Sequence, residues 1–460
     1  MPPPKALVLG VQLPGVSDDE HRSSLKELSR LAKTLGLEVV ATESQPRAAL
    51  SKAAVVGRGK LKTLGRYGGG PGEIPNPVPA HRRKKAAQAE VAREEDDDAV
   101  EASEASEASE EETLAGDTSA VPHVDVILVD HELTPSQLRN LERATGAEVL
   151  DRTSVILEIF SRHAKSREAR LEVEIARLTY LAPRVRESGG GGDRQRGGVG
   201  GRGAGESALE LDRRKIRDRI AELRRELARI GDTSGTRRQR RASVPTVALV
   251  GYTNAGKSSL MRRLTGSEVY VADALFATLD TTVRALAPET HPRILVTDTV
   301  GFIKKLPHDL VASFRSTLDE ALEADLLLHL ADASDPAFPQ QIAVTEEVLR
   351  EIGASASKQL VLNKCDRLSP AELERLGREH PGALLVSAHR PEDVARVREH
   401  IIAHFERGMI DGEITIPYAE HARVAQIHAE ARVLSERHDE EGTHLRVRAP
   451  AALLARLREG

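Results

Sequence analysis

Short apolar runs alternate with amphipathic segments over the first 154 residues. Apolar positions recur at helical spacing from residue 18 to residue 35, and Gly36 ends that pattern. Thr134 and Gln137 form a capping box with Pro135 at the first helical position, which predicts a second helix. The runs with the length and composition of buried strands are residues 5–11, 38–42, 124–129 and 147–150. Strands that alternate with helices predict a small parallel α/β domain over residues 1–154.

The middle of the chain has two long helical patterns separated by a glycine-rich segment. Apolar side chains recur at helical spacing over residues 155–183 and again over residues 206–230. Residues 188–205 between them are rich in glycine. The pattern predicts an antiparallel helical hairpin across residues 155–243, whose second helix spans about 37 Å at 1.5 Å per residue.

The glycine-rich segment has the chemistry of a loop that contacts phosphates. It combines few bulky side chains with three cations, Arg194, Arg196 and Arg202. Glycines permit close backbone approach, and guanidinium groups pair with phosphates. Because the chain is 2% aromatic and has no tryptophan, structured RNA read by shape and charge fits better than base stacking. The alternative is a flexible loop between two core helices.

From residue 244 onward, each apolar run ends in a cluster of polar and glycine residues. The runs are residues 246–250, 293–297, 359–362 and 383–386, and each has the length of a buried strand. A second α/β domain is therefore expected over residues 244–408. Residues 412–460 mix strand-like runs with a helical pattern and predict a small α+β module.

The first of these clusters has the pattern of a P-loop. It follows an apolar run and precedes a helical pattern, which is the context that a phosphate-binding loop needs. Its glycines let the backbone wrap round an anion, and the helix N-terminus adds partial positive charge. Lys257 is expected to reach the β- and γ-phosphates, and Ser258 to offer its hydroxyl to Mg²⁺. The residues of this loop are Gly251, Tyr252, Thr253, Asn254, Ala255, Gly256, Lys257 and Ser258.

Two further clusters complete the phosphate and metal site of a GTPase. One is residues 298–301 after the second apolar run, and the other is residues 276–282, which lie between the P-loop and that run. Asp298 can hold Mg²⁺ through a water, and the amide of Gly301 can meet the γ-phosphate. Thr278 is expected to complete the Mg²⁺ shell, so the candidate catalytic residues are Lys257, Thr278 and Gly301. The nucleotide contacts expected from these two clusters are Phe276, Ala277, Thr278, Leu279, Asp280, Asp298, Thr299, Val300 and Gly301.

The last two clusters have the pattern of a guanine-recognition site. Asp366 can accept hydrogen bonds from the N1–H and N2–H₂ donors of guanine, a pair that adenine lacks. The backbone at residues 387–389 can contact the guanine O6. The base-site residues are Asn363, Lys364, Cys365, Asp366, Ser387, Ala388 and His389. Five motifs in this order predict an enzyme that hydrolyses GTP to GDP and phosphate.

The residue after Gly301 affects the expected rate of hydrolysis. Many small GTPases have a glutamine there that orients the attacking water, whereas this chain has Phe302. A phenyl ring neither donates nor accepts such a hydrogen bond. We therefore expect slow hydrolysis by the isolated chain, with the attacking water positioned by a partner or by another element.

The composition of the chain limits the class of protein to which it can belong. The 460 residues, of which 40% are hydrophobic, are too many for one core. The single cysteine, Cys365, excludes an intramolecular disulfide and is expected to be a spacer in the base motif. No run approaches about 18 apolar residues, and no secretory signal opens the chain. We therefore expect a soluble, cytoplasmic protein without a membrane span.

The net charge of −5 conceals an acidic block. Residues 92–112 hold eleven acidic residues and one arginine, a net charge of −10, so the remaining chain carries +5. The block has no hydrophobic periodicity and belongs to a low-complexity stretch over residues 67–122. We expect a disordered acidic insertion there. Acidic mimicry of nucleic acid is the alternative to a solvated segment.

Signatures of a known family are distributed along the chain. They are residues 130–142, 151–153, 171–174, 183–184, 197–206, 209–214, 251–258, 275–280 and 298–310. Through them, nearly the whole chain outside the insertion strongly resembles the HflX family of ribosome-associated GTPases, within the Obg–HflX group. The N-terminal and helical signatures are specific, because GTPases in general do not share them.

The resemblance implies a partner and a role. It implies binding to the large ribosomal subunit and its rRNA, with the glycine-rich loop near the peptidyl-transferase region, and GTP-linked dissociation or rescue of ribosomes, notably under stress. We expect stimulation of GTP hydrolysis by ribosomes, and we expect a monomer. Two alternatives stay open: a GTPase that assists large-subunit assembly, and a nucleotide-controlled adaptor with little turnover.

The resemblance also bears on ions. It implies Mg²⁺ as cofactor. Asn254 resembles the asparagine that holds a monovalent cation in several GTPase families with a hydrophobic residue at the glutamine position, which suggests K⁺ stimulation. A local loop hydrogen bond is the alternative role for Asn254. The chain departs from the family in its acidic insertion, in Thr281 where proline is frequent, and in residues 412–460.

Overall fold

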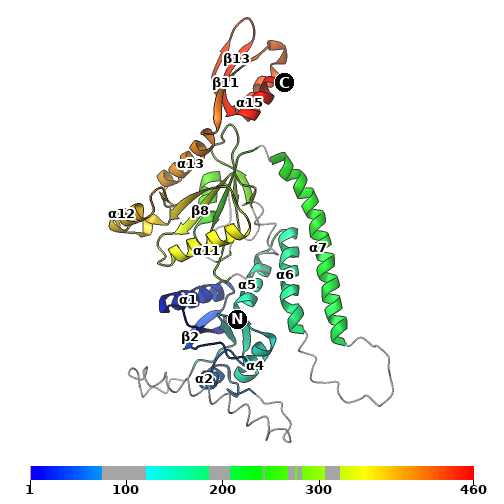
Figure 1. Cartoon of the computed structure of the whole chain (residues 1–460), viewed down its shortest axis with the longest axis vertical. Coiled ribbons are helices and arrows are strands. Elements are labelled where there is room, and N and C mark those ends of the chain that lie inside the picture. Colours follow the sequence, from blue (N-terminus) through cyan, green and yellow to red (C-terminus); the bar gives the residue numbers. More distant parts are fainter. Residues whose placement is uncertain are drawn as a thin grey trace. The chain divides into compact units, whose positions relative to one another are not determined.

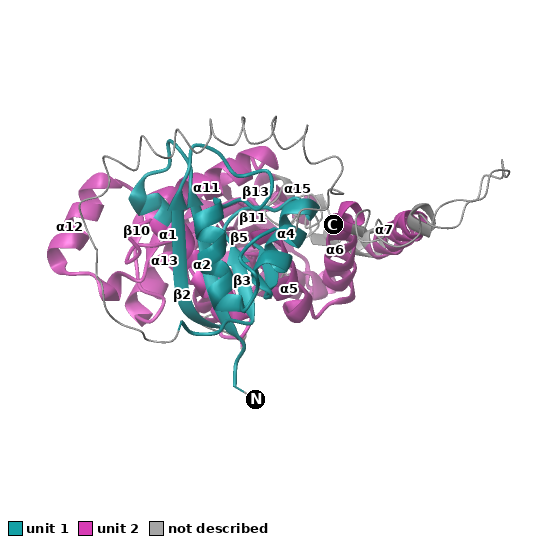
Figure 2. Ribbon diagram, turned by 90° about the horizontal axis from the view of Figure 1, so that it is seen from below, with its two compact units in different colours: residues 1–21, 37–151 teal, residues 22–36, 152–460 magenta. Residues whose placement is uncertain are grey.

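The computed structural model describes residues 2–74, 121–185, 208–241, 244–267, 275–276, 282–305 and 322–459 (Figure 1). Most of the predicted acidic insertion lies outside these residues, as do the glycine-rich segment with Arg194, Arg196 and Arg202, and the residues Ala277, Thr278, Leu279 and Asp280. The chain divides into two compact units. Unit 1 comprises residues 1–21 and 37–151, and unit 2 comprises residues 22–36 and 152–460 (Figure 2).

Unit 1 contains a four-stranded parallel sheet in the order β2-β1-β3-β4. Its strands are β1 (Lys5–Gln12), β2 (Glu38–Pro46), β3 (Val126–Val129) and β4 (Glu148–Asp151). The helices α2 (Arg58–Gly68) and α4 (Pro135–Thr145) contribute Leu64 and Leu141 to the same core as Leu7 and Ile127. The predicted parallel α/β architecture is confirmed, although the predicted strand boundaries differ by a residue or more.

The predicted capping box of α4 is present in unit 1. The Thr134 hydroxyl accepts a hydrogen bond from the Gln137 amide at 3.3 Å, and the Gln137 side chain accepts one from the Thr134 amide at 3.0 Å. Gly146 closes the helix in the left-handed conformation, at φ +74°. Local sequence signals therefore fix both ends of this helix.

Unit 2 contains a six-stranded sheet in the order β10-β9-β8-β5-β7-β6. Only the β6–β7 pair is antiparallel among these strands. In chain order the strands are β5 (Thr246–Gly251), β6 (Thr282–Ala285), β7 (Leu295–Asp298), β8 (Leu326–Asp332), β9 (Ser357–Asn363) and β10 (Leu384–Leu385). The helices that follow its parallel strands are α8 (Lys257–Thr265), α11 (Phe338–Glu351), α12 (Pro370–Glu379) and α13 (Pro391–Glu406).

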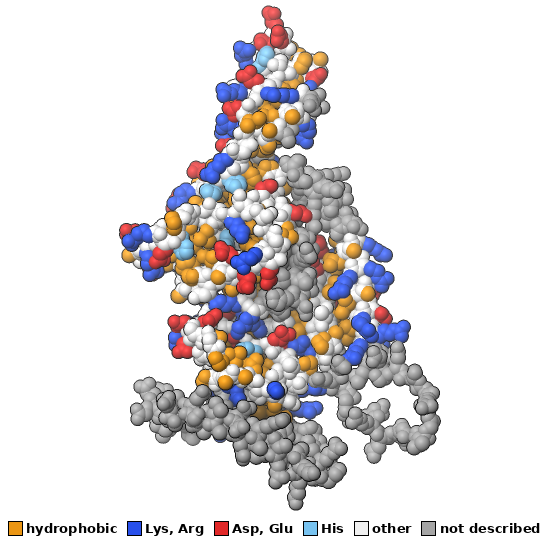
Figure 3. Space-filling view, in the orientation of Figure 1, with side chains coloured by type: hydrophobic (Ala, Val, Ile, Leu, Met, Phe, Trp, Pro, Cys, Tyr) orange, Lys and Arg blue, Asp and Glu red, His pale blue; other side chains and the backbone are white. Residues whose placement is uncertain are grey.

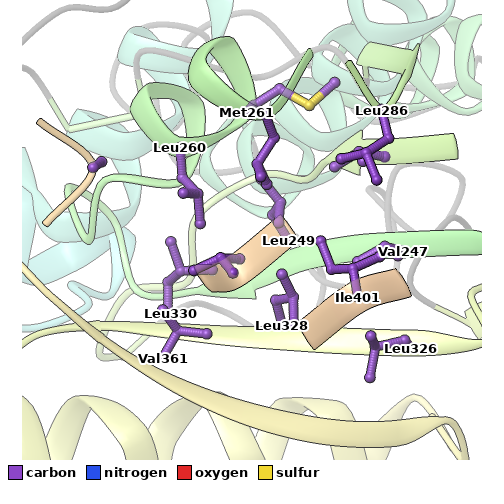
Figure 4. Packing of buried hydrophobic residues seen from close by; sticks show 14 of the residues in the cluster. Val247, Leu249, Leu260, Met261, Leu286, Leu326, Leu328, Leu330, Val361 and Ile401 are labelled. Carbon is purple, nitrogen blue, oxygen red and sulfur yellow. The ribbon is translucent and has the colours of Figure 1, made fainter. Parts of the chain in front are cut away.

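The central strand β5 is buried on both faces. Val247 and Leu249 pack with residues of α8 and α13 such as Met261 and Ile401 (Figure 4). The alternate residues Ala248 and Val250 belong to a second apolar cluster that includes Leu349 of α11. This arrangement explains the continuous apolar run, because a parallel strand covered by helices on both faces has no solvated side.

The predicted first helix of the hairpin is interrupted, which corrects the single helical pattern expected over residues 155–183. The structure has α5 (Arg152–His163) and α6 (Arg167–Val185). The Ser166 hydroxyl accepts a hydrogen bond from the Ala169 amide at 3.0 Å, so a new helix starts after the break.

The second helix is longer than expected. It is α7 (Ala208–Arg241), and no proline interrupts this stretch. Leu171 and Ile175 of α6 pack against Leu223 of α7, while Lys and Arg side chains line the other side of α7 (Figure 3). The helix has twelve Lys and Arg and six acidic residues, a net charge of +6.

The C-terminal residues form a three-stranded antiparallel sheet in the order β11-β13-β12. Its elements are β11 (Met409–Ile416), α14 (Ala422–Glu430), β12 (Arg432–His438), β13 (Thr443–Pro450) and α15 (Ala451–Glu459). The strand β12 was not predicted, because its side chains are nearly all exposed and give no alternating pattern. Among the described helices, none is long and apolar enough to cross a membrane.

Candidate nucleotide-binding site

The P-loop connects the end of β5 to the start of α8, and two of its glycines are sterically required. Gly251 has φ +146°, and a Cβ there would lie 2.1 Å from the Leu330 carbonyl oxygen. Gly256 has φ +94°, and a Cβ there would lie 2.2 Å from the Asn363 side-chain nitrogen. Both positions combine a left-handed backbone with close contact, so side chains are excluded. The loop can therefore approach an anion through its backbone.

Lys257 is buried at the first position of α8. Its Nζ donates hydrogen bonds to the carbonyl oxygens of Gly251 at 3.0 Å and Tyr252 at 2.9 Å. Burial lowers the pKa of Lys257 to about 8, and the nearby Asp298 carboxylate partly opposes that shift. A bound phosphate would favour the charged ammonium for the same reason as Asp298. The site thus has a preplaced cation, whose protonated form a bound anion would stabilise further.

Gly301 lies against the P-loop lysine. A Cβ on Gly301 would meet Thr253 Cα at 2.8 Å and Lys257 Nζ at 2.9 Å. The loop after β7 also pairs with the P-loop, because the Thr253 amide donates to the Phe302 carbonyl at 2.8 Å. The Gly301 amide thus belongs to the immediate surroundings of the Lys257 ammonium.

Two of the predicted metal ligands lie together. The Ser258 hydroxyl donates a 2.7 Å hydrogen bond to Asp298 Oδ2. Both are hard oxygen donors of the kind that Mg²⁺ prefers, so this part of the donor set fits the ion. The neighbouring Thr299 is fixed by a 2.7 Å hydrogen bond from its hydroxyl to the Leu249 carbonyl. Thr278, the third predicted ligand, lies outside the described residues.

The base motif links the P-loop to the loop after β10. Asn363 donates to the Ala255 carbonyl at 2.9 Å and accepts from the Ala388 amide at 3.0 Å. The Lys364 ammonium pairs with Asp332 at 2.7 Å. Asn363 therefore fixes the P-loop, the base-motif loop and the loop after β10 relative to one another.

Asp366 is exposed at the position expected for a guanine contact. A hydrogen bond from the Ser387 hydroxyl holds its pKa below the ordinary value, so the carboxylate is ionised at neutral pH. Cys365 is buried, donates to the Leu362 carbonyl at 3.2 Å, and has its pKa raised to about 11 by burial. A thiol of this kind is a packing group and not a nucleophile.

Phe302 is buried in the apolar cluster that contains Val250 and Leu327, with 2% of its surface exposed. It follows that the side chain at this position contributes packing and cannot hold a water. Phe276, predicted as a nucleotide contact, has its ring edge-on to Phe160 of α5, with the ring centroids 4.7 Å apart. The predicted contacts Val300 and His389 lie in the loops after β7 and β10.

A cavity of about 600 Å³ lies beside the P-loop and the base motif, lined by Asn254 and Lys364. It is also lined by Lys26, Arg30 and Lys33 of α1 (Asp18–Thr34). These three cations were not predicted from the sequence. Their spacing of four and three residues puts them on one helix face, but the same spacing is typical of an ordinary solvated face.

Comparisons with known proteins agree with the motifs. The family models described as GTP-binding GTPase N-terminal, GTP-binding GTPase Middle Region and 50S ribosome-binding GTPase match residues 22–68 with 102–161, 163–241, and 246–364. The GTPase HflX of Gluconacetobacter diazotrophicus is 55% identical over 458 residues, covering 99% of this chain and 98% of that protein. The GTPase HflX of Escherichia coli is 40% identical over 331 residues, covering 71% of this chain and 78% of that protein.

Solved structures of lower similarity were also found. A GTP-binding protein from the archaeon Sulfolobus solfataricus, in complex with GDP, is 21% identical with a TM-score of 0.41, covering 86% of this chain and 99% of that chain.

Proposed function

The chain belongs to the HflX family of GTPases, and we propose that it binds the large ribosomal subunit and promotes ribosome dissociation or rescue, notably under stress. GTP binding and hydrolysis are the established part of this account. The ribosomal partner, the consequence for the ribosome and a cytoplasmic location are the proposed part.

The chemistry at the phosphates follows from the residues already described. Lys257 balances charge on the β- and γ-phosphates, and the Gly301 amide donates to the γ-phosphate as negative charge moves during its transfer to water. Phe302 packs into the core and orients no water. Hydrolysis by the isolated chain is therefore slow, and the partner completes the site.

Two ions belong to the proposal. Mg²⁺ would be held by Ser258, by Thr278 and, through a water, by Asp298, and it would neutralise charge on the β- and γ-phosphates. K⁺ would bind beside Asn254, whose backbone has φ +61° and which lines the cavity next to Lys364. A monovalent cation there would supply positive charge that no side chain of the P-loop other than Lys257 provides.

The observation that carries the ribosomal proposal is the match of residues 246–364 to the model described as 50S ribosome-binding GTPase. The charge of +6 on α7 supports it, because clustered cations bind nucleic-acid phosphates with release of counterions. Arg194, Arg196 and Arg202 are the proposed rRNA contacts of the loop between α6 and α7.

Pelleting with large subunits at several salt concentrations tests this proposal. Joint replacement of Arg194, Arg196 and Arg202 by alanine should weaken pelleting and flatten its salt dependence, because fewer counterions are released. Affinity for GTP in the absence of ribosomes should not change. Unaltered pelleting and unaltered stimulation of GTP turnover would mean that the loop is a passive linker.

A further inference from the structure

Part of helix α1 belongs to the same compact unit as the GTP site. Residues 22–36 group with residues 152–460 (Figure 2). The structure gives this segment two features at the P-loop: a buried hydrogen-bonded anchor and a row of cations along a cavity. The helix α1 itself does not require either feature in order to form or to end.

The anchor is the carboxylate of Glu27. It accepts a hydrogen bond from the Tyr252 hydroxyl in the P-loop and another from the Arg152 guanidinium at the start of α5. The same Tyr252 hydroxyl accepts a 2.7 Å hydrogen bond from the Lys304 amide, three residues beyond Gly301. Glu27 thus connects α1 to the P-loop and, through Tyr252, to the segment that follows the γ-phosphate contact.

The anchor is enclosed and strongly polar. Tyr252 has 3% and Arg152 has 2% of its surface exposed. Burial raises the pKa of Tyr252 and lowers the pKa of Arg152 to about 10, so at neutral pH the phenol keeps its proton and the guanidinium keeps its charge. Charged groups buried in this way persist only when they are paired and hydrogen-bonded, as they are here.

Two weaker contacts lie on either side of Glu27 along the helix. The Lys305 ammonium donates to the Ser24 hydroxyl at 3.3 Å, and Arg30 pairs with Asp335 at 3.6 Å. Each is more exposed than the Glu27 cluster and contributes little alone. Their positions nevertheless show that contact with the GTP-binding part extends over two turns of α1.

The cavity beside the anchor is cationic. Its α1 wall carries Lys26, Arg30 and Lys33, and its lining also includes Asn254 and Lys364. Counting every lining side chain, five are cationic and two are carboxylates, a net charge of +3. A cavity of about 600 Å³ with this charge, next to both nucleotide-recognition motifs, has the chemistry of a polyphosphate site.

We propose that residues 22–36 form a wall of the GTP site, held on the P-loop by Glu27 and presenting Lys26, Arg30 and Lys33 to the bound guanine nucleotide. Because GTP carries one more phosphate than GDP, the wall stabilises GTP more than GDP. The α1 segment is then a part of the nucleotide site that favours the more highly charged GTP.

The first test removes the charge of the wall. In the full chain without ribosomes, the variant with Lys26→Gln, Arg30→Gln and Lys33→Gln should bind GTP roughly ten-fold more weakly and GDP roughly three-fold more weakly at low salt. Both losses should shrink as salt is added. The matched control replaces the exposed Arg350, Arg375 and Arg378 by glutamine, which changes the net charge equally away from the cavity. Equal affinities of the two variants for GTP would overturn the proposal.

The second test concerns the anchor. Tyr252→Phe removes the hydroxyl, and with it the hydrogen bonds to Glu27 and from the Lys304 amide, but leaves the Glu27–Arg152 pair. It should weaken GTP binding roughly five-fold or more, since each buried hydrogen bond contributes about 1 kcal/mol. In the Tyr252→Phe background, the three glutamine substitutions should reduce GTP affinity by a smaller factor than in wild type, because the wall is no longer held on the P-loop. Additive losses would overturn the role of Tyr252 as a positioning residue. Tyr418→Phe, at an exposed tyrosine between β11 and α14, is the control.

These measurements use nucleotide binding alone. The proposal about α1 can be wrong while the ribosomal proposal is right, and the ribosomal proposal can be wrong while the proposal about α1 is right. Thermal unfolding of each variant identifies any that does not fold.

Discussion

Ser258 and Asp298, forty positions apart in the chain, share a hydrogen bond of 2.7 Å at the carboxyl edge of the sheet. One residue lies in the first turn of the helix after β5 and the other ends the adjacent strand β7. Because parallel neighbours end at the same edge, the sheet itself brings a hydroxyl and a carboxylate to one point. That point is where Mg²⁺ is proposed to bind.

Loss of either hydroxyl ligand should raise the Mg²⁺ requirement. Ser258→Ala and Thr278→Ala should each need a higher Mg²⁺ concentration for half-maximal GTP hydrolysis, because one oxygen ligand is lost. Thr265→Ala is the control, since that hydroxyl at the end of α8 donates to the Met261 carbonyl. If GTP hydrolysis by Thr278→Ala depends on Mg²⁺ concentration as it does in wild type, Thr281 or Thr282 is the better candidate for the Mg²⁺ ligand.

Base selectivity should depend on Asp366. Asp366→Asn should weaken GTP binding about a hundred-fold or more, because an amide accepts from only one guanine donor and opposes the other with its own N–H. The variant should gain affinity for xanthine nucleotides, whose ring accepts where guanine donates. Competition titrations with GTP and XTP measure both changes, and an unchanged preference for GTP would remove Asp366 from the base site.

Nucleotide affinity should fall as pH rises past the pKa of Lys257. Burial places that pKa at about 8, and bound phosphates raise it, so binding takes up a proton above pH 8. Between about pH 7.5 and 8.8, GTP affinity should decline by up to ten-fold per unit. The same depressed pKa means that unfolding free energy should rise with pH between about 8 and 10.5, where the unfolded chain binds the extra proton. Calorimetry in buffers of different ionisation enthalpy measures the proton taken up when the nucleotide binds. An affinity for GTP that does not change with pH would contradict the role of Lys257 at the phosphates.

The P-loop glycines should be structurally irreplaceable. Gly251→Ala puts a Cβ 2.1 Å from the Leu330 carbonyl at φ +146°, and should lower the free energy of unfolding by about 2 kcal/mol or more. Gly377→Ala in α12 meets only an ordinary contact of 3.7 Å to Leu385, and should stabilise the protein by about 0.5–1 kcal/mol. Chemical denaturation of the two variants compares them directly. Equal effects would refute the steric argument.

The positions of the predicted GTP-binding motifs at strand ends could be predicted from the sequence, because each motif is local. A strand, a turn and a helix start lie within about ten residues in the P-loop, and Asn363 and Ser387 likewise follow single apolar strands. Their meeting follows from parallel-sheet topology and needs no long-range information.

The residues that were missed depend on tertiary contact. Glu27 lies 125 positions before Arg152 and 225 before Tyr252, and nothing in their local sequences indicates that they meet. The break between α5 and α6 depended on Ser166 acting as a cap, which a continuing apolar pattern concealed. The exposed strand β12 gave no alternation to detect.

Sucrose-gradient analysis of 70S ribosomes incubated with the full chain tests the central claim most directly. With a non-hydrolysable GTP analogue, the account predicts loss of the 70S peak, a gain in free subunits and comigration of the protein with the large subunit. GDP should leave the 70S peak intact, and Asp366→Asn should fail with the guanine analogue. Intact 70S ribosomes with the analogue, or association with immature large subunits alone, would contradict the account.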